Sequence, residues 1–233
     1  MVVVLFAGFA ALLIALIIFG VIAARKRRDA LASLAASWGF QWSRDDPIGI
    51  ADRFSSHRSL AQGDNRYAYN VFQGERKGRR VICFDYHYAT HSTDSKGRRQ
   101  THHHHFSGAL ADLGARFPDL TVRPEGFFDK VAEFVGADDI DFESAEFSRK
   151  FHVKADDRRF AYDIFHARAM EYMLAHPVDM TFDFRGDTVL VTGGGTWKPE
   201  RYDAALRRIE GLIELVPEFV WRSLREGGAR KGV

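Results

Sequence analysis

The sequence lacks several features that would place it in a familiar functional class. Its 233 residues contain one cysteine, Cys83, which excludes an internal disulfide framework and fits a reducing compartment. The formal net charge is only +2, and much of it comes from one short basic cluster, so no positively charged stripe for nucleic acid remains. The sequence carries no phosphate-binding loop, no spaced pair of carboxylates and no nucleophile with a matched base. No motif therefore predicts a reaction.

The most informative segment is an apolar run at residues 2–24, directly followed by four basic residues. As a helix it would be roughly 34 Å long, whereas the hydrocarbon core of a bilayer is about 30 Å thick. A cleaved secretory signal is the alternative, but it would carry positive charge ahead of a shorter apolar region. The observed order predicts an uncleaved transmembrane helix with its basic flank in residues 1–28. The basic side chains expected at the cytoplasmic membrane surface are Arg25, Lys26, Arg27 and Arg28.

The rest of the chain is predicted to form a soluble α+β domain on the cytoplasmic side of the cell membrane. Its 46% hydrophobic and 13% aromatic residues supply ample material for a core. We expect the domain at residues 29–225 and a tail at 226–233, with lobes at 29–123 and 124–225 as an alternative division. The strands are expected to be antiparallel and in two groups, with helices covering one face.

Hydrophobic periodicity and turn residues place the individual elements. Strands are expected at residues 40–42, 66–73, 80–88, 101–110, 147–153, 178–184 and 188–191. Helices are expected at residues 29–38, 124–135, 158–176 and 199–216, with a short helical piece after Pro217. Residues 113–123 are predicted to be irregular, with a turn around Pro118 and a brief strand at residues 120–122. Arg185, Gly186 and Asp187 are predicted to form a hairpin turn.

A run of four histidines lies within the predicted strand at residues 101–110. If Tyr86 pairs with Phe106, the pairing also sets His87 opposite His105, with opposed Cβ atoms about 5 Å apart. One face would then carry His87, His91, His103 and His105. Such imidazoles could hold zinc, nickel or copper, with Asp85 and Asp94 as auxiliary ligands. The alternative is a water-exposed polar face without metal, because a register slip of one residue would disperse the cluster.

Residues 142–174 carry a phenylalanine-rich stretch that leads into a helix. This pattern resembles the core of bacterial single-pass membrane-anchored proteins that carry a domain of unknown function. The matching residues are Phe147, Phe151, Val153, Asp157, Ala161 and Met170, whereas Ala167 stands where that pattern has proline. The resemblance extends to the anchor, the basic cluster and residues 38–40. It implies a fold and a membrane location but no activity, because that family offers no catalytic residues to carry over.

We therefore expect a membrane-tethered, non-enzymatic binding or scaffolding module at the cytoplasmic membrane face. The expected partners are the lipid bilayer and another membrane or cytoplasmic protein; neither a cofactor nor nucleic acid is expected. The alternative function is a metal-binding sensor or a metal-dependent enzyme that uses His87, His91, His103 and His105. A third hypothesis is recognition of anionic lipid by the basic cluster beside the membrane.

Overall fold

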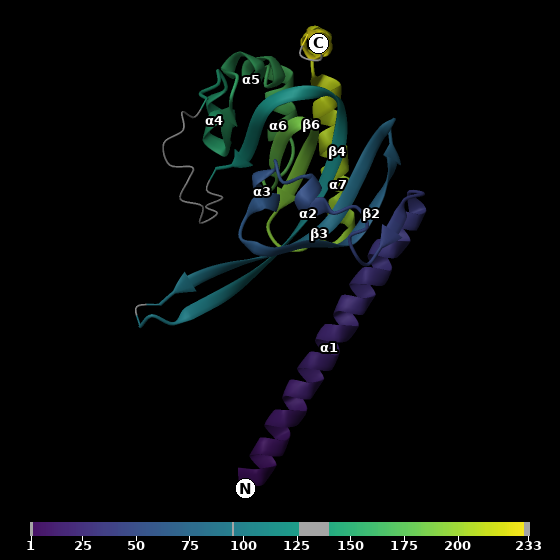
Figure 1. Cartoon of the computed structure of the whole chain (residues 1–233), viewed down its shortest axis with the longest axis vertical. Coiled ribbons are helices and arrows are strands. Elements are labelled where there is room, and N and C mark those ends of the chain that lie inside the picture. The colour runs from purple at the N-terminus through teal and green to yellow at the C-terminus, as the bar shows by residue number, and fades with distance from the viewer. Residues whose placement is uncertain (1, 95, 126–139, 231–233) are drawn as a thin grey trace.

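The computed structural model describes residues 2–94, 96–125 and 140–230. It has an α+β fold, in which one long helix, α1 (Val2–Ser37), projects from a body built on a single sheet (Figure 1). The six strands are β1 (Gln41–Ser43), β2 (Asp64–Arg76), β3 (Arg79–Thr93), β4 (Arg99–Pro124), β5 (Phe151–Ala155) and β6 (Thr181–Gly193). The predicted α+β class is confirmed, but the two predicted groups of strands belong to one sheet.

The sheet is antiparallel and is centred on β4. Its order is β1-β2-β3-β4-β5, and β6 pairs with β4 as well. The strand β4 reaches three partners because it is 26 residues long and changes register along its length. The predicted hairpin of β2 and β3 is confirmed, and both strands are longer than expected.

Helices cover both faces of the sheet, and not one face as predicted. They are α2 (Ile50–Arg53), α3 (Arg58–Ala61), α4 (Ala145–Lys150), α5 (Arg158–Ile164), α6 (Ala167–Leu174), α7 (Pro199–Leu215) and α8 (Glu218–Arg230). Strand β3 explains the difference, because its alternating side chains are apolar on both sides. Cys83 lies in the larger core with α1 and α5–α8, whereas Ile82 and Phe84 lie in a second core with α2 and α3.

Helix α1 belongs to the body at one end only. Leu31 and Ala35 are completely buried in the larger core, and the helix stops where Gly39 adopts a φ of 70°. The helix predicted at residues 29–38 is therefore the last part of α1. Among the residues that the structure describes, no helix meets the length and apolarity required to cross a membrane.

Two segments predicted as turns are parts of strands. Residues 113–123 continue β4, so the brief strand predicted at residues 120–122 is confirmed as part of a longer strand. The expected turn is absent because Pro118 lies where the pairing with β6 shifts register, between Phe117 and Leu120. At such an irregularity proline's missing N–H removes no ladder hydrogen bond. Opposite Phe117, Gly186 adopts a φ of 58° within β6, so the predicted hairpin at residues 178–191 is one continuous strand with a local irregularity.

The predictions for residues 124–176 need three corrections. Phe147 lies in α4, which Ser144 caps by accepting a hydrogen bond from the Phe147 N–H, so the strand begins only at Phe151. The single helix predicted at 158–176 is divided into α5 and α6, because Phe165 leaves helical geometry and becomes buried. Pro124 ends β4, and most of the helix predicted at 124–135 lies outside the described residues. By contrast, the helix predicted at 199–216 is confirmed as α7.

Candidate functional site

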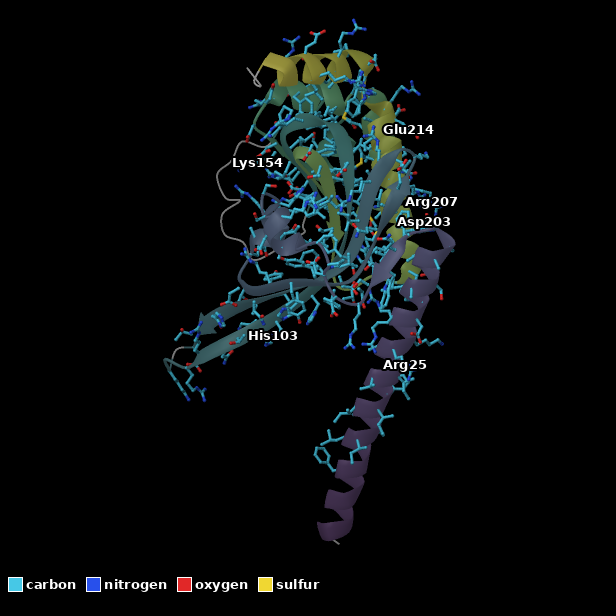
Figure 2. The ribbon with its side chains drawn as sticks, turned by 45° about the vertical axis from the view of Figure 1, so that its right-hand side comes forward. Arg25, His103, Lys154, Asp203, Arg207 and Glu214 are labelled. Atoms are coloured by element: carbon cyan, nitrogen blue, oxygen red, sulfur yellow. The ribbon has the colours of Figure 1, made fainter. Side chains whose placement is uncertain are left out.

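The ends of β3 and β4 form an arm that projects from the body (Figures 1 and 2). We define the arm as residues 87–93 and 99–105 with the connecting turn. The pairing of Tyr86 with Phe106 is confirmed, as are the pairings of His87 with His105 and His91 with Thr101. Because side chains alternate along a strand, the arm has two chemically different faces.

The first face, called here the histidine face, carries His87, His91, His103 and His105. His87 Nε2 and His103 Nδ1 are 3.0 Å apart, and the rings of His87 and His105 have centroids 4.8 Å apart. His91 lies further along the arm, where its ring contacts Asp64 and Thr101 instead. The structure thus brings three of the four predicted imidazoles together and leaves the fourth apart.

The imidazoles of the histidine face already have protein partners. The Tyr69 hydroxyl is hydrogen-bonded to His105 Nδ1 at 3.1 Å, and burial raises the pKa of Tyr69 to about 12, which keeps the hydroxyl protonated. Burial, with the neighbouring His87 and His103, lowers the pKa of His105. In the described part of the chain, no group of three or more His, Cys, Asp or Glu residues is arranged to hold a metal ion. The metal site at His87, His91, His103 and His105 stays a prediction.

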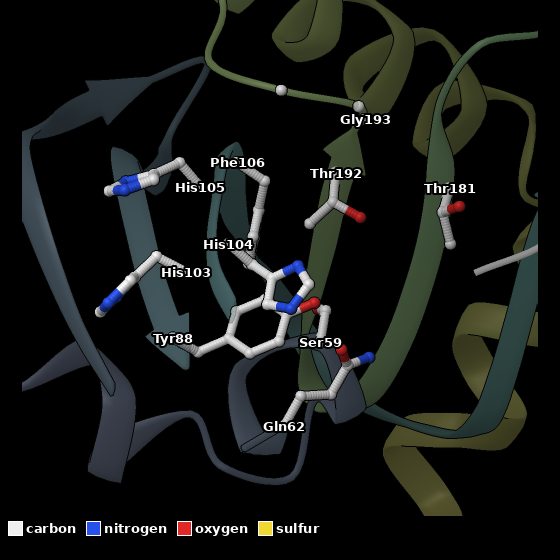
Figure 3. Close-up of a pocket in the computed structure, with 12 residues that line it drawn as sticks. Ser59, Gln62, Tyr88, His103, His104, His105, Phe106, Thr181, Thr192 and Gly193 are labelled. Carbon is white, nitrogen blue, oxygen red and sulfur yellow. The ribbon is translucent and has the colours of Figure 1, made fainter. Parts of the chain in front are cut away.

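The second face of the arm lines a pocket of about 310 Å³ at the arm's root (Figure 3). Tyr88 and His104 stack there with ring centroids 4.6 Å apart and planes 13° apart. Ser59 and Gln62 extend into the pocket from α3 and the residue that follows it, whereas the side chains of His103 and His105 point to the other side of the sheet (Figure 3). The wall opposite the arm comes from β6 and the glycine-rich loop after it, with Thr181, Thr192, Gly193, Gly194 and Gly195.

The pocket lining suits a ligand that is polar but uncharged. Hydroxyl, amide and imidazole groups can exchange hydrogen bonds with it, and among the described lining residues none is Asp, Glu, Lys or Arg. Gly193 allows the loop to pass close to the body, because a Cβ at that position would lie 2.8 Å from Arg201 Nη2 and 3.1 Å from the Asp179 carbonyl oxygen. The glycine-rich loop after β6 thus forms one wall of the pocket.

A buried carboxylate, Asp85, lies beside the root of the arm on the same side of the sheet as the histidine face. Its side chain is completely buried; Oδ2 accepts two hydrogen bonds and Oδ1 accepts three. Arg27 of α1 binds it in a bidentate manner, with N–O distances of 2.6 and 2.9 Å. The other donors are Asn70 at 2.7 Å, Ser107 at 2.5 Å and Tyr202 at 2.8 Å.

The Arg27–Asp85 pair, called here the clamp, joins α1 to the sheet. Burial alone would lower the pKa of Arg27, but the hydrogen bonds and charge of Asp85 raise it, so the guanidinium stays charged. Arg27 also donates to the Trp197 carbonyl oxygen over 2.7 and 3.0 Å. Of the basic residues predicted at the membrane surface, Arg25 and Lys26 are exposed and Arg28 is half-buried, whereas Arg27 points into the body.

A second buried polar network lies at β6, away from the arm. His57 is completely buried, with Nδ1 2.9 Å from Asp183 and Nε2 2.9 Å from Thr188. Asp183 also accepts hydrogen bonds from Thr121 at 2.7 Å and Arg185 at 3.0 Å. Burial opposes ionisation of Asp183, but its bond to His57 and the adjacent charges outweigh burial and lower its pKa.

Sequence reasoning missed both polar networks and the pocket. It treated Asp85 only as an auxiliary metal ligand, although a single aspartate inside the apolar stretch ICFDY is itself a signal of a buried, partnered charge. Its donors could not be named, because Arg27 and Tyr202 are 58 and 117 residues away in sequence. His57 stands in a polar stretch and gives no comparable signal.

Comparison with known proteins identifies the fold and no family. No protein-family model and no curated protein matches the chain. Among solved structures, the chain is similar to the crystal structure of the mycobacterial trehalose monomycolate transport factor A, TtfA, with a TM-score of 0.58 and 16% sequence identity. The similarity covers 83% of this chain and 97% of that chain. At this identity the likeness establishes that the two proteins share a fold.

Proposed function

We propose that this chain is a membrane-tethered, non-enzymatic binding module that assists the transport of an amphiphilic molecule with a polar, uncharged head group. The clamp carries this proposal, because it fixes the apolar helix α1 directly beside the arm whose other face lines the pocket. A ligand-binding pocket would thus be held at a set position relative to the bilayer. The name of TtfA, a transport factor, supports a transport role for the shared fold.

The proposed tether is supported by the side chains that α1 exposes. Over half of the residue's surface is exposed at Phe9, Leu12, Ile14, Leu16, Ile17, Ile18, Phe19, Val21 and Ile22. Leaving so many large apolar groups in water is unfavourable, at about 25 cal/mol per Å², and lipid would remove that cost. The basic residues that follow favour placing the body on the cytoplasmic side.

The tether is tested by alkaline carbonate extraction of membranes that contain the full chain. We expect the native protein to stay in the membrane and a Leu13→Arg/Ile17→Arg variant to be released, because arginine in a hydrocarbon core is costly. A Tyr162→Arg/Phe219→Arg variant, which changes two exposed aromatic residues of the body, should stay bound like the native protein. Release of the native protein would contradict the tether.

The binding role is tested by mass spectrometry of small molecules that co-purify with the chain in mild detergent. A Ser59→Phe variant fills the pocket and should lose the bound molecule. The matched control is Ser55→Phe, an exposed position outside the pocket lining, which should retain it. The proposal fails if the native chain carries nothing with a polar, uncharged head, or if both variants retain the same molecules.

The metal-binding alternative rests on the close approach of three imidazoles on the histidine face. It predicts stoichiometric zinc, nickel or copper in protein purified without an affinity tag, and loss of that metal in a His103→Ala/His105→Ala variant. Elemental analysis of the two proteins decides between the alternatives. Metal-free native protein would leave the binding module as the better description.

A further inference from the structure

The arm and the exposed part of α1 project from the same end of the body. Both views show this, and Figure 2 places His103 on the arm at nearly the height of Arg25 along the long axis. The histidine face also shares one side of the sheet with Asp85, since His87 is two residues further along the same strand. Asp85 binds Arg27, so α1 packs on that side. The histidine face therefore lies on the same side of the sheet as α1.

Two tyrosines of β2 lie beside the histidine face and suit a membrane–water interface. Tyr67 of β2 pairs with His87, and their rings stack with centroids 4.7 Å apart, while 45% of Tyr67 remains exposed. The edge of the same surface holds Tyr69, whose ring meets His105 edge to face. Tyrosine rings favour the headgroup level of a bilayer because one end is apolar and the other is polar.

The tip of the arm adds a net positive charge. Lys96, Arg98 and Arg99 are exposed there, and the one carboxylate among them, Asp94, is paired with Arg98 at 2.9 Å. Hydrogen bonds from the Lys96 and Arg98 N–H groups to Asp94 hold the turn in shape. Asp64 of β2 lies further back, against His91. The outermost described residues of the arm thus carry a net positive charge, which complements an anionic surface.

We infer that the arm lies on the membrane surface and that its tip binds the head groups of anionic lipids. This inference rests on the proposed tether, because α1 brings the arm to the bilayer. The tip and α1 would then contact the membrane at two separate points. Two contacts would restrict rotation of the body about α1. The pocket lies on the other face of the arm, so these contacts would not block it.

The test uses a fluorescent label on the full chain in vesicles. The native Cys83 is completely buried, so an introduced surface cysteine can be labelled selectively. Thr93→Cys places the label beside the tip, and Ser223→Cys places it on α8 at the opposite end of the body (Figure 1). Quenching is measured with head-group spin-labelled lipid in phosphatidylcholine vesicles, with and without phosphatidylserine.

We expect quenching at position 93 to be at least twice that at position 223, and to increase when phosphatidylserine is present. A Lys96→Glu/Arg99→Glu change should remove the increase. The same change of charge on α8, Arg222→Glu/Arg225→Glu, should leave it intact. Equal quenching at the two positions, or an increase that survives reversal of the tip charges, would overturn the inference.

Carbonate extraction of the same vesicles separates failure of the arm from failure of the tether. A chain that stays embedded while position 93 is no more quenched than position 223 contradicts the arm alone. A chain that is extracted contradicts the tether and the arm together.

Discussion

Asp85 and Asp183 are both buried aspartates on the central sheet, but their partners differ in origin. Asp85 binds donors from α1, β2, β4 and α7, including a side chain from the helix that leaves the body. Asp183 binds His57, Thr121 and Arg185, all of them within the body. The first network therefore connects the body to α1, whereas the second only fixes the α2–α3 segment and β4 to β6.

A buried carboxylate surrounded by hydrogen-bond donors has a different consequence at each of the two aspartates. A buried carboxylate needs several donors, and the elements that supply those donors are held at fixed positions. Around Asp183 this stabilises the body. Around Asp85 it also holds α1 at Arg27, next to the end of the helix that is buried in the larger core, which is a functional matter if α1 is the tether. Substitutions at the two aspartates separate these roles.

The largest expected effect is that of Asp85→Ala. Removing the carboxylate takes away the charged acceptor shared by Arg27, Ser107 and Tyr202, and leaves Arg27 and Tyr202 with only backbone carbonyl acceptors. We expect a loss of about 3–5 kcal/mol in the free energy of unfolding. Chemical denaturation of the full chain in detergent, followed by near-ultraviolet circular dichroism, measures it. A loss below about 1 kcal/mol would mean that solvent or another group replaces Asp85 easily.

Asp183→Asn should lower the free energy of unfolding by less, about 2–3 kcal/mol. The amide keeps one acceptor oxygen, but it has no charge to pair with Arg185. The effect depends on pH. Since the folded-state pKa of Asp183 is lowered, its stabilisation is present above the unfolded value of about 3.9 and is lost as the pH falls through the folded value.

Denaturation at a series of pH values checks the expected sign. The difference in unfolding free energy between the native chain and Asp183→Asn should shrink as the pH falls below about 4. A difference that grows on acidification would show that folding raises the pKa of Asp183 and does not lower it.

Arg27→Met should cost about 1–2 kcal/mol, which is less than Asp85→Ala. The side chain of Arg27 is 25% exposed, and Asp85 would keep three neutral donors. The neighbouring Arg28→Met is the control and should change stability by less than about 0.5 kcal/mol. Thermal unfolding of both variants in detergent distinguishes them, and equal destabilisation would argue against a special role for Arg27.

The smallest effect is expected for Arg76→Met, which breaks a bridge between β2 and α7. Arg76 pairs with Asp203 at 2.8 Å and Glu210 at 2.6 Å, but the three side chains are partly exposed, so we expect a loss of about 1 kcal/mol or less. High salt should weaken the native bridge and reduce the difference between the variant and the native chain. If Arg76→Met lowers the free energy of unfolding as much as Asp85→Ala, the clamp is no more important for stability than a partly exposed ion pair.

The sequence was sufficient to predict features governed by short-range pattern. The pairing of His87 with His105 followed from alternation and from the short turn between the strands, and α7 followed from a 3.6-residue period that begins at Pro199. Pro118 and Gly186 were misinterpreted as turns, because both residues also occur at irregularities inside strands. A turn and an irregularity inside a strand differ in whether a partner strand continues alongside, and the sequence of one segment does not identify its partner strand.

The candidate site was harder to predict because its parts come from distant segments. Tyr88 and His104 meet Ser59 and Thr192 only after β3, β4 and β6 have paired around α3. The clamp likewise depends on how the end of α1 packs against the body, and the pattern of apolar residues in α1 does not specify that packing. The basic residues of α1 were all predicted to lie at the membrane surface. Only the packing of α1 in the structure places Arg27 against Asp85 of β3.

The distance between α1 and the body in the membrane tests most directly whether the clamp holds α1 in place. Spin labels at Ala24→Cys and Ser55→Cys, both exposed positions, report it by double electron–electron resonance in lipid nanodiscs. We predict one narrow distance distribution for the native clamp and a broad one after Asp85→Ala, whereas Asp183→Asn should keep the narrow distribution. A native distribution as broad as that of Asp85→Ala would show that α1 moves freely, and it would contradict the proposal that the clamp holds the pocket in place at the membrane.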